Sequence, residues 1–166
     1  NIPHNDVSIT QFIKTQIENI VMILPEFKLI IIGKNPSLEL IELSKKYDRY
    51  IEIKGYVETL DDVFNGACGM IIPLMFGSGV KLKTLEAMAK GLPVIATDFG
   101  VEGIPVTKGV NCLVENNFDN YPDVLSKLCD VQLNEKISKE AIKFYNNYYA
   151  KDVVFRHYED IFMIND

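Results

Sequence analysis

The amino-acid sequence predicts a doubly wound α/β domain, that is, a Rossmann-like parallel sheet with helices on both faces. Short apolar runs alternate with stretches of helical periodicity, and this alternation is typical of parallel βαβ units. The 166 residues are enough for one domain with a full core, so we assign residues 1–166 to a single domain. The composition, 48% hydrophobic and 24% charged, is ordinary for a globular protein.

The first elements follow from periodicity and from helix-ending residues. Residues 9–24 carry apolar side chains at helical spacing, and Pro25 ends that helix. Residues 27–32 form a continuous apolar run closed by Gly33, which indicates a strand covered on both faces. Ser37 is placed to cap the helix that follows.

The rest of the chain continues the alternation. Further strands are expected at residues 50–53, 68–74, 93–96 and 112–114, and further helices at 60–65, 121–129, 134–147 and 153–164. Between the strands at 68–74 and 93–96 lies the stretch around which the chain is organised. It contains a glycine-bearing loop, a helix and a glycine stop.

The loop of that stretch has the features of an anion site. Gly77 and Gly79 permit tight turns and leave no side chain in the way of a ligand. Ser78 is a candidate N-cap for the following helix, whose N-terminal N–H groups and dipole suit a phosphate. Lys81 and Lys83 add positive charge at the N-terminus of this helix. Cations there do not stabilise the helix dipole, so the two lysines indicate another role.

Glu86 lies three residues beyond Lys83, on the same side of the helix. One helical turn of roughly 5 Å would separate a phosphate at the loop from a sugar diol at the carboxylate. A plainer interpretation remains open, because Leu82, Leu85, Met88 and Ala89 have core spacing. On that interpretation the segment is a packed helix with a few surface charges.

The run 83–97 (KTLEAMAKGLPVIAT), followed by 98–103 (DFGVEG), resembles the donor-binding signature of group 1 retaining glycosyltransferases with the GT-B fold. The similarity extends through 28–33, 55–57 and 148–162, and so covers nearly the whole chain in order. The resemblance implies the C-terminal, donor-binding half of such an enzyme. Members of the family begin this domain with a central strand, which this chain lacks before its first helix.

The resemblance also assigns roles to residues. It implies that Lys83 and Lys81 pair with the departing diphosphate and that Glu86 accepts the ribose hydroxyls; these three are the expected catalytic group. The expected donor-binding residues are Gly33, Tyr56, Val57, Gly77, Ser78, Gly79, Val80, Leu82 and Glu86, with Tyr56 and Val57 holding the base through their backbone. Alternatively, Tyr56 merely caps the sheet. The family usually has a sugar-contacting glutamate where this chain has Ser78.

The implied function is transfer of a hexosyl group from a UDP-sugar or GDP-sugar to an acceptor hydroxyl, in surface polysaccharide or glycolipid synthesis, with no metal or other cofactor. An N-terminal acceptor-binding domain would be the partner, with the helix at 153–164 packing toward it, and residues 1–166 alone would be inactive. Two alternatives stay open: a non-catalytic nucleotide-binding module, and a domain like that of a sugar-nucleotide epimerase. Glu102 would contact donor or acceptor, or else be simply solvated.

The bulk composition excludes other classes. A net charge of −6 argues against a nucleic-acid binder, and no apolar run approaches the roughly 20 residues of a membrane span. Cys68, Cys112 and Cys129 have no metal or redox spacing, so we expect reduced, mostly buried thiols and a cytoplasmic protein. Peripheral membrane association of the full-length protein is left open. His4 and His157 are expected at the surface.

Overall fold

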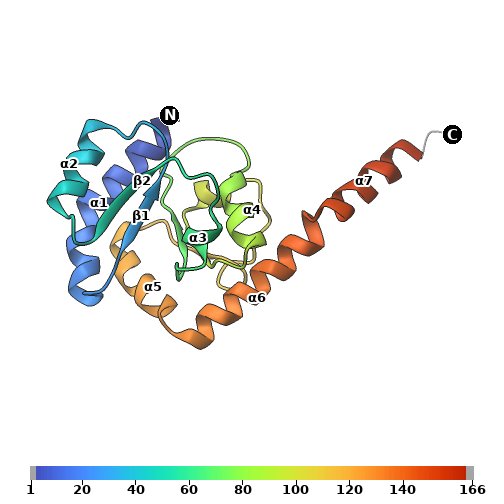
Figure 1. Ribbon diagram of the computed structural model, residues 1–166. Coiled ribbons are helices and arrows are strands. Elements are labelled where there is room, and N and C mark those ends of the chain that lie inside the picture. The colour runs from blue at the N-terminus through green and yellow to red at the C-terminus, as the bar shows by residue number, and fades with distance from the viewer. Residues whose placement is uncertain (1–2, 164–166) are drawn as a thin grey trace.

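The computed structural model describes residues 3–163, which form seven α-helices, two 3₁₀ helices and five strands (Figure 1). In chain order these are α1 (Pro3–Ile23), β1 (Leu29–Ile32), α2 (Leu38–Lys46), β2 (Ile51–Gly55), α3 (Asp61–Phe64), β3 (Met70–Ile72), α4 (Leu82–Ala89), β4 (Val94–Ala96), η1 (Asp98–Val101), β5 (Leu113–Val114), η2 (Phe118–Asn120), α5 (Tyr121–Leu128), α6 (Val131–Tyr148) and α7 (Lys151–Met163). All five predicted strands and the alternation of strands with helices are confirmed.

The strands form two hydrogen-bonded pieces, in both of which every pairing is parallel. One piece is β1-β2 and the other is β3-β4-β5. Within residues 3–163 no ladder joins β1 to β3. The interruption lies where the resemblance expects the first central strand to be lacking, and it leaves backbone edges on both sides unpaired.

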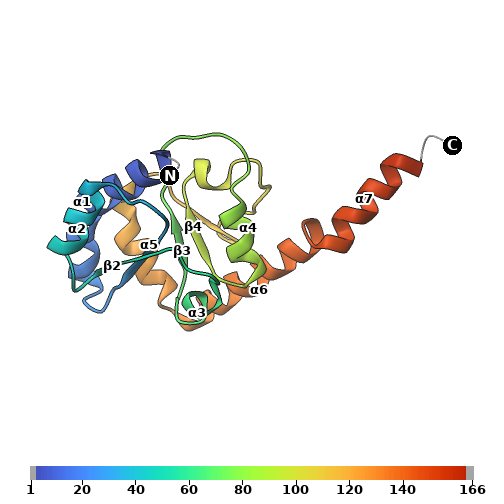
Figure 2. The same ribbon diagram turned by 45° about the horizontal axis from the view of Figure 1, so that its top comes forward.

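The three-stranded piece is covered on both faces, which confirms the doubly wound architecture. Val94, Ile95 and Ala96 of β4 are all almost completely buried. Alternation along the strand sends Ile95 into a core with α1 and α5, whereas Val94 and Ala96 pack in a second core with α4. Figure 2 shows β3 and β4 between these two groups of helices.

The two-stranded piece, by contrast, is covered on one face only. Leu29 of β1 and Ile51 of β2 are buried in the core that α1 contributes to. Ile30, which points to the opposite face, is 36% exposed. The expectation that residues 27–32 form a strand covered on both faces is therefore wrong, because α1 and α2 pack on the same side of this piece.

Helix α1 begins well before the predicted start at residue 9, and the extra turns reach the carboxyl edge of the sheet. Phe12 of this helix is fully buried in the core. Its ring makes edge contacts with the rings of Phe118 and Tyr121, at centroid distances of 5.5 and 5.1 Å. Near the start of the helix, Ser8 Oγ accepts a hydrogen bond of 3.2 Å from the backbone N–H of Met75. The first turn of α1 is thereby fixed beside the loop that follows β3.

The last two helices extend away from the body of the domain. Helix α6 packs along α4 and buries Ala141 and Phe144. Helix α7 contacts α6 and continues outward in both views (Figures 1 and 2), where Phe155 is 55% exposed. The predicted helix at 153–164 is present, although residue 164 and the side chain of His157 lie outside the described residues. No helix of the described chain combines the length and apolarity needed to cross a membrane.

The cysteines differ from the expectation of buried thiols. Cys112 is buried, and burial raises the pKa of its thiol to about 12. Cys68 and Cys129 are exposed, because they lie in the turns before β3 and after α5 rather than inside those elements. The expectation of a buried thiol is therefore confirmed for Cys112 and wrong for Cys68 and Cys129.

Candidate functional site

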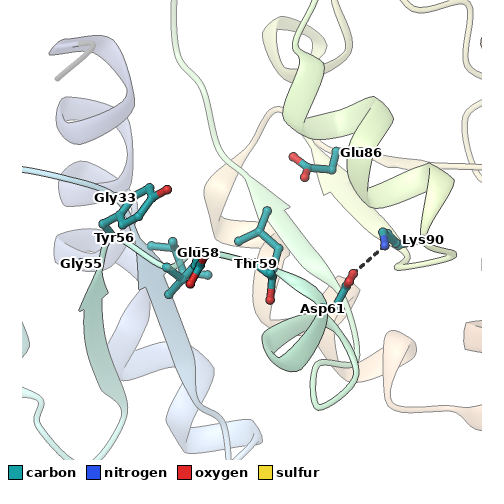
Figure 3. A pocket seen from close by; sticks show the side chains of 11 residues that line it. Gly33, Gly55, Tyr56, Glu58, Thr59, Asp61, Glu86 and Lys90 are labelled. Carbon is teal, nitrogen blue, oxygen red and sulfur yellow. Dashed lines mark hydrogen bonds and ion pairs between the residues drawn. The ribbon is translucent and has the colours of Figure 1, made fainter.

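A pocket of about 510 Å³ lies between the carboxyl ends of β1 and β2 and the outer side of α4 (Figure 3). It is lined by Ile32, Gly33, Gly55, Tyr56, Val57, Glu58, Thr59, Leu60, Asp61, Glu86 and Lys90. Four of the predicted site residues, Gly33, Tyr56, Val57 and Glu86, thus meet in one cavity. The pocket sits beside the interruption of the sheet, at the carboxyl ends of the strands, where doubly wound sheets bind ligands.

Glu86 projects from α4 into this pocket (Figure 3). Its side chain is exposed, and among residues 3–163 it has no hydrogen bond or ion pair. Lys90, one turn further along α4, is paired instead with Asp61 at 2.6 Å. The Glu86 carboxylate therefore offers its lone pairs to the cavity, and an ionised carboxylate can only accept hydrogen bonds.

Tyr56 marks the other side of the pocket, across from Glu86 (Figure 3). Its side chain is 68% exposed, and the Lys34 ammonium lies 4.2 Å from the ring centroid. A residue that capped the sheet would be packed against it, so this exposure argues against the cap interpretation. The exposed aromatic face and the backbone of Val57 are both available to a flat, partly apolar ligand.

The glycine loop lies outside the pocket lining and under the first turn of α1. Gly77 and Gly79 have φ of 120° and 83°, values that favour glycine. A Cβ at Gly77 would come within 3.3 Å of the His4 ring, which also makes an edge contact with Phe76 at 6.2 Å. His4 is therefore half-buried against the loop, and the expectation of a surface histidine is wrong.

Helix α4 begins after the loop rather than at Ser78. The N-cap residue is Lys81, which makes no side-chain capping bond, so the predicted Ser78 cap is wrong. The N–H of Thr84 donates to the Lys81 carbonyl at 2.9 Å, and the N–H groups of Leu82 and Lys83 are the ones that a helix start leaves for a ligand. Leu82, an expected donor-binding residue, is 75% exposed, which argues against the plainer interpretation that placed it in the core. Thr84 takes a buried position instead, because its hydroxyl donates a hydrogen bond of 2.7 Å to the carbonyl of Gly100.

The two lysines of this turn point in different directions. Lys83 Nζ donates to Asn5 Oδ1 of α1 at 2.7 Å and is half-buried. Burial lowers the pKa of the Lys83 ammonium, and the charge of Lys81 lowers that pKa further. Lys81 is buried and turns toward Glu102, with Nζ 3.3 Å from Oε2. Glu102 is therefore ion-paired and not simply solvated, whereas its contact with donor or acceptor stays a prediction.

These groups give the site two ends of opposite character. At one end the N-termini of α1 and α4 converge with Lys83, an arrangement that favours an anion. At the other end the unpaired carboxylates of Glu86 and Glu58 face a cavity and favour hydroxyl and N–H donors. A molecule that joins a diphosphate to a sugar and a base has this same polarity.

Sequence reasoning missed several members of the site. Asn5 was not a candidate, because its contact with Lys83 joins residues far apart in the chain. Lys34 beside the Tyr56 ring and the pocket residues Glu58, Asp61 and Lys90 were also missed. A signal was available for Lys34 and Glu58, which follow the carboxyl ends of β1 and β2 within three residues, at the edge where ligands bind.

Comparison with known proteins identifies the class. Residues 5–130 match the family model described as glycosyl transferases group 1, and the chain belongs to that family. A curated relative from Klebsiella pneumoniae, an uncharacterized 44.6 kDa protein in the cps region, is 31% identical over 84 residues. Those residues are 46% of this chain and 22% of the relative.

Solved structures of glycosyltransferases share the fold. S. aureus TarM superposes with a TM-score of 0.80 at 18% identity, over 99% of this chain and 33% of TarM. The C-terminal domain of LpcC from Francisella tularensis superposes with a TM-score of 0.71 at 22% identity, over 86% of this chain and 79% of that domain. Anabaena HepE in complex with UDP and glucose superposes with a TM-score of 0.70 at 15% identity. The match covers 90% of this chain and 45% of HepE. These matches confirm a GT-B fold, and the chain spans a third of TarM and less than half of HepE.

Proposed function

We propose that this chain is the donor-binding half of a retaining glycosyltransferase that uses a nucleoside diphosphate sugar. The observation that carries the proposal is the Glu86 carboxylate, unpaired and directed into the pocket. A ribose diol is a suitable partner for it, and the base would lie against Tyr56 and the backbone of Val57. Gly33 would border the nucleoside at the end of β1.

The diphosphate would lie at the glycine loop, next to Lys83. Gly77, Ser78 and Gly79 would present backbone N–H groups there, and Leu82 and Lys83 at the start of α4 would add theirs. Val80, which is 48% exposed, and Leu82 would flank the donor. Lys83 is one helical turn before Glu86, a rise of roughly 5 Å, which suits the separation of a diphosphate from its ribose.

In the proposed reaction the bond between the anomeric carbon and the diphosphate oxygen breaks, and the electron pair leaves with the diphosphate. An acceptor hydroxyl attacks the anomeric carbon from the same face and gives its proton to the departing phosphate oxygen. Lys83 and the two helix N-termini stabilise the charge that develops on the leaving group. Ser78 stands where the family usually has a sugar-contacting glutamate, and its exposed hydroxyl would be the remaining polar group there.

The nucleotide, the product and the partner domain also belong to the proposal. HepE and TarM crystallised with UDP, which favours a UDP-sugar over a GDP-sugar. The relative encoded in a cps region favours a role in polysaccharide synthesis. We also propose that the transferred group is a hexosyl group and that the reaction takes place in the cytoplasm. The exposed α7, with Phe155 at the surface, would pack on an N-terminal acceptor-binding domain. Residues 1–166 alone would bind donor and turn over little or nothing.

Binding of UDP is expected to weaken as the pH rises through the lowered pKa of Lys83. Below that pKa the ammonium is charged and attracts the diphosphate. Above it the attraction is lost, at a lower pH than for an ordinary lysine, because burial has lowered the pKa. Calorimetry in buffers of different ionisation enthalpy should show proton uptake on UDP binding at alkaline pH. Lys83→Met should abolish that uptake, whereas Lys143→Met, at an exposed ion pair with Glu140 on α6, should keep it. Proton uptake that survives Lys83→Met would contradict this assignment.

The proposed function is tested by titrating UDP and GDP separately against the folded protein. Binding of either nucleotide supports the donor site, and binding of neither rejects both the enzyme and the nucleotide-binding module. The full-length protein supplied with donor and acceptor then separates the remaining alternatives. Acceptor-dependent release of nucleoside diphosphate identifies a transferase, release or rearrangement without acceptor favours an epimerase-like enzyme, and no turnover favours the module.

A further inference from the structure

Lys81 has the surroundings of a fixed structural cation rather than of a ligand-binding lysine. Its side chain is 7% exposed, although it lies at the end of a loop whose neighbours Ser78, Gly79 and Val80 are all exposed. A buried ammonium is costly unless it is paired and hydrogen-bonded. Lys81 meets this condition within the protein, since Nζ lies 2.6 Å from the carbonyl oxygen of Gly79 and 3.3 Å from Glu102 Oε2.

These two contacts connect the glycine loop to the segment that follows η1. The Gly79 carbonyl belongs to the loop itself, and Glu102 is the residue immediately after η1. A second contact lies next to them: a Cβ at Gly103, whose φ is 75°, would be only 2.9 Å from Val80 Cγ2. The loop is therefore held to residues 102 and 103 by a charged contact and by close packing.

We propose that Lys81 and Glu102 are positioning residues that hold the glycine loop in its anion-binding conformation, while Lys83 makes the direct contact with the diphosphate. The loop needs such support, because glycines at positive φ gain the most conformational freedom when a restraint is lost. The ligand part of this inference rests on the proposed function. The restraint of the loop does not, and it is measurable in the free protein.

The first measurement is NMR relaxation of the backbone amides in the ligand-free protein. In Lys81→Met and in Glu102→Gln, the order parameters of residues 77–80 are expected to fall below about 0.6, from the roughly 0.85 of a restrained backbone. Lys139→Met, which breaks an exposed ion pair with Glu135 on α6, should leave these order parameters unchanged. If the buried Lys81→Met variant does not fold, Glu102→Gln decides the test, because the Glu102 side chain is 46% exposed.

The second measurement compares UDP with uridine. Both variants should weaken UDP binding by about five- to tenfold and leave uridine binding unchanged, because only the phosphates use the loop. The double variant should be no weaker than either single one, and Lys81→Arg should restore most of the affinity. If Lys81 itself bound the diphosphate, Glu102→Gln would free it and strengthen UDP binding.

The outcomes separate the two proposals. Tighter UDP binding in Glu102→Gln, or unchanged order parameters of residues 77–80 in the variants, overturns the positioning role. Failure of the unmodified protein to bind either UDP or uridine rejects the proposed function, and the order parameters still decide whether Lys81 and Glu102 restrain the loop.

Discussion

Replacing Phe12 with alanine is expected to lower the free energy of unfolding by about 3–5 kcal/mol, the usual cost of truncating a buried phenylalanine. The ring is fully buried and contacts the rings of Phe118 and Tyr121. The loss should appear in urea unfolding followed by circular dichroism, as a lower midpoint with a similar slope.

The matched control is Met22→Ala on the same helix. Met22 is 79% exposed, so its truncation should change the free energy of unfolding by no more than about 0.5 kcal/mol. Because Asn5 and His4 reach the glycine loop from the first turn of α1, the Phe12 variant should also bind UDP less tightly at temperatures where it is still folded. Equal stability of the two variants would show that α1 is not anchored as described.

Replacing Glu86 with alanine is expected to weaken UDP binding by about 1–3 kcal/mol, the cost of losing hydrogen bonds to a charged acceptor. The structural reason is that the carboxylate has no partner within the described chain and faces the pocket. Its proposed partners are the ribose hydroxyls, so 2′-deoxy-UDP should bind more weakly than UDP to the unmodified protein. In Glu86→Ala that difference should disappear.

Glu42→Ala provides the control for this experiment. Glu42 is also an exposed helical glutamate, but it lies on α2 and does not line the pocket. Its removal should leave the affinities for UDP and for 2′-deoxy-UDP unchanged. A difference between the two nucleotides that persists in Glu86→Ala would place the ribose elsewhere.

Much of the fold could be predicted because local patterns determine it. The apolar runs that became β1 and β4, and the glycine that ends α4, signal their structures within a few residues. The burial of the strands was less predictable. Ile30 has the same apolar character as Ile95, yet only Ile95 is covered, because coverage depends on which helices pack on each piece of the sheet.

The candidate site was predictable where a motif specifies it and not where tertiary contacts do. Glu86 and the glycine loop could be predicted as site features because their residue types lie at short spacing in the sequence. The different roles of Lys81 and Lys83 depend on Glu102 and on Asn5, which are distant in sequence. The burial of Thr84 has a similar cause, since its hydroxyl donates to the carbonyl of Gly100, 16 residues away in sequence.

A crystal structure of the protein with UDP tests the central claim most directly. The account predicts ribose oxygens within about 3 Å of the Glu86 carboxylate, and phosphate oxygens at the loop 77–79 and Lys83. Lys90 also lines the pocket, and it offers the competing position for a phosphate. A nucleotide whose phosphates sit on Lys90, with its ribose turned away from Glu86, would contradict the assignment of this pocket to a sugar-nucleotide donor.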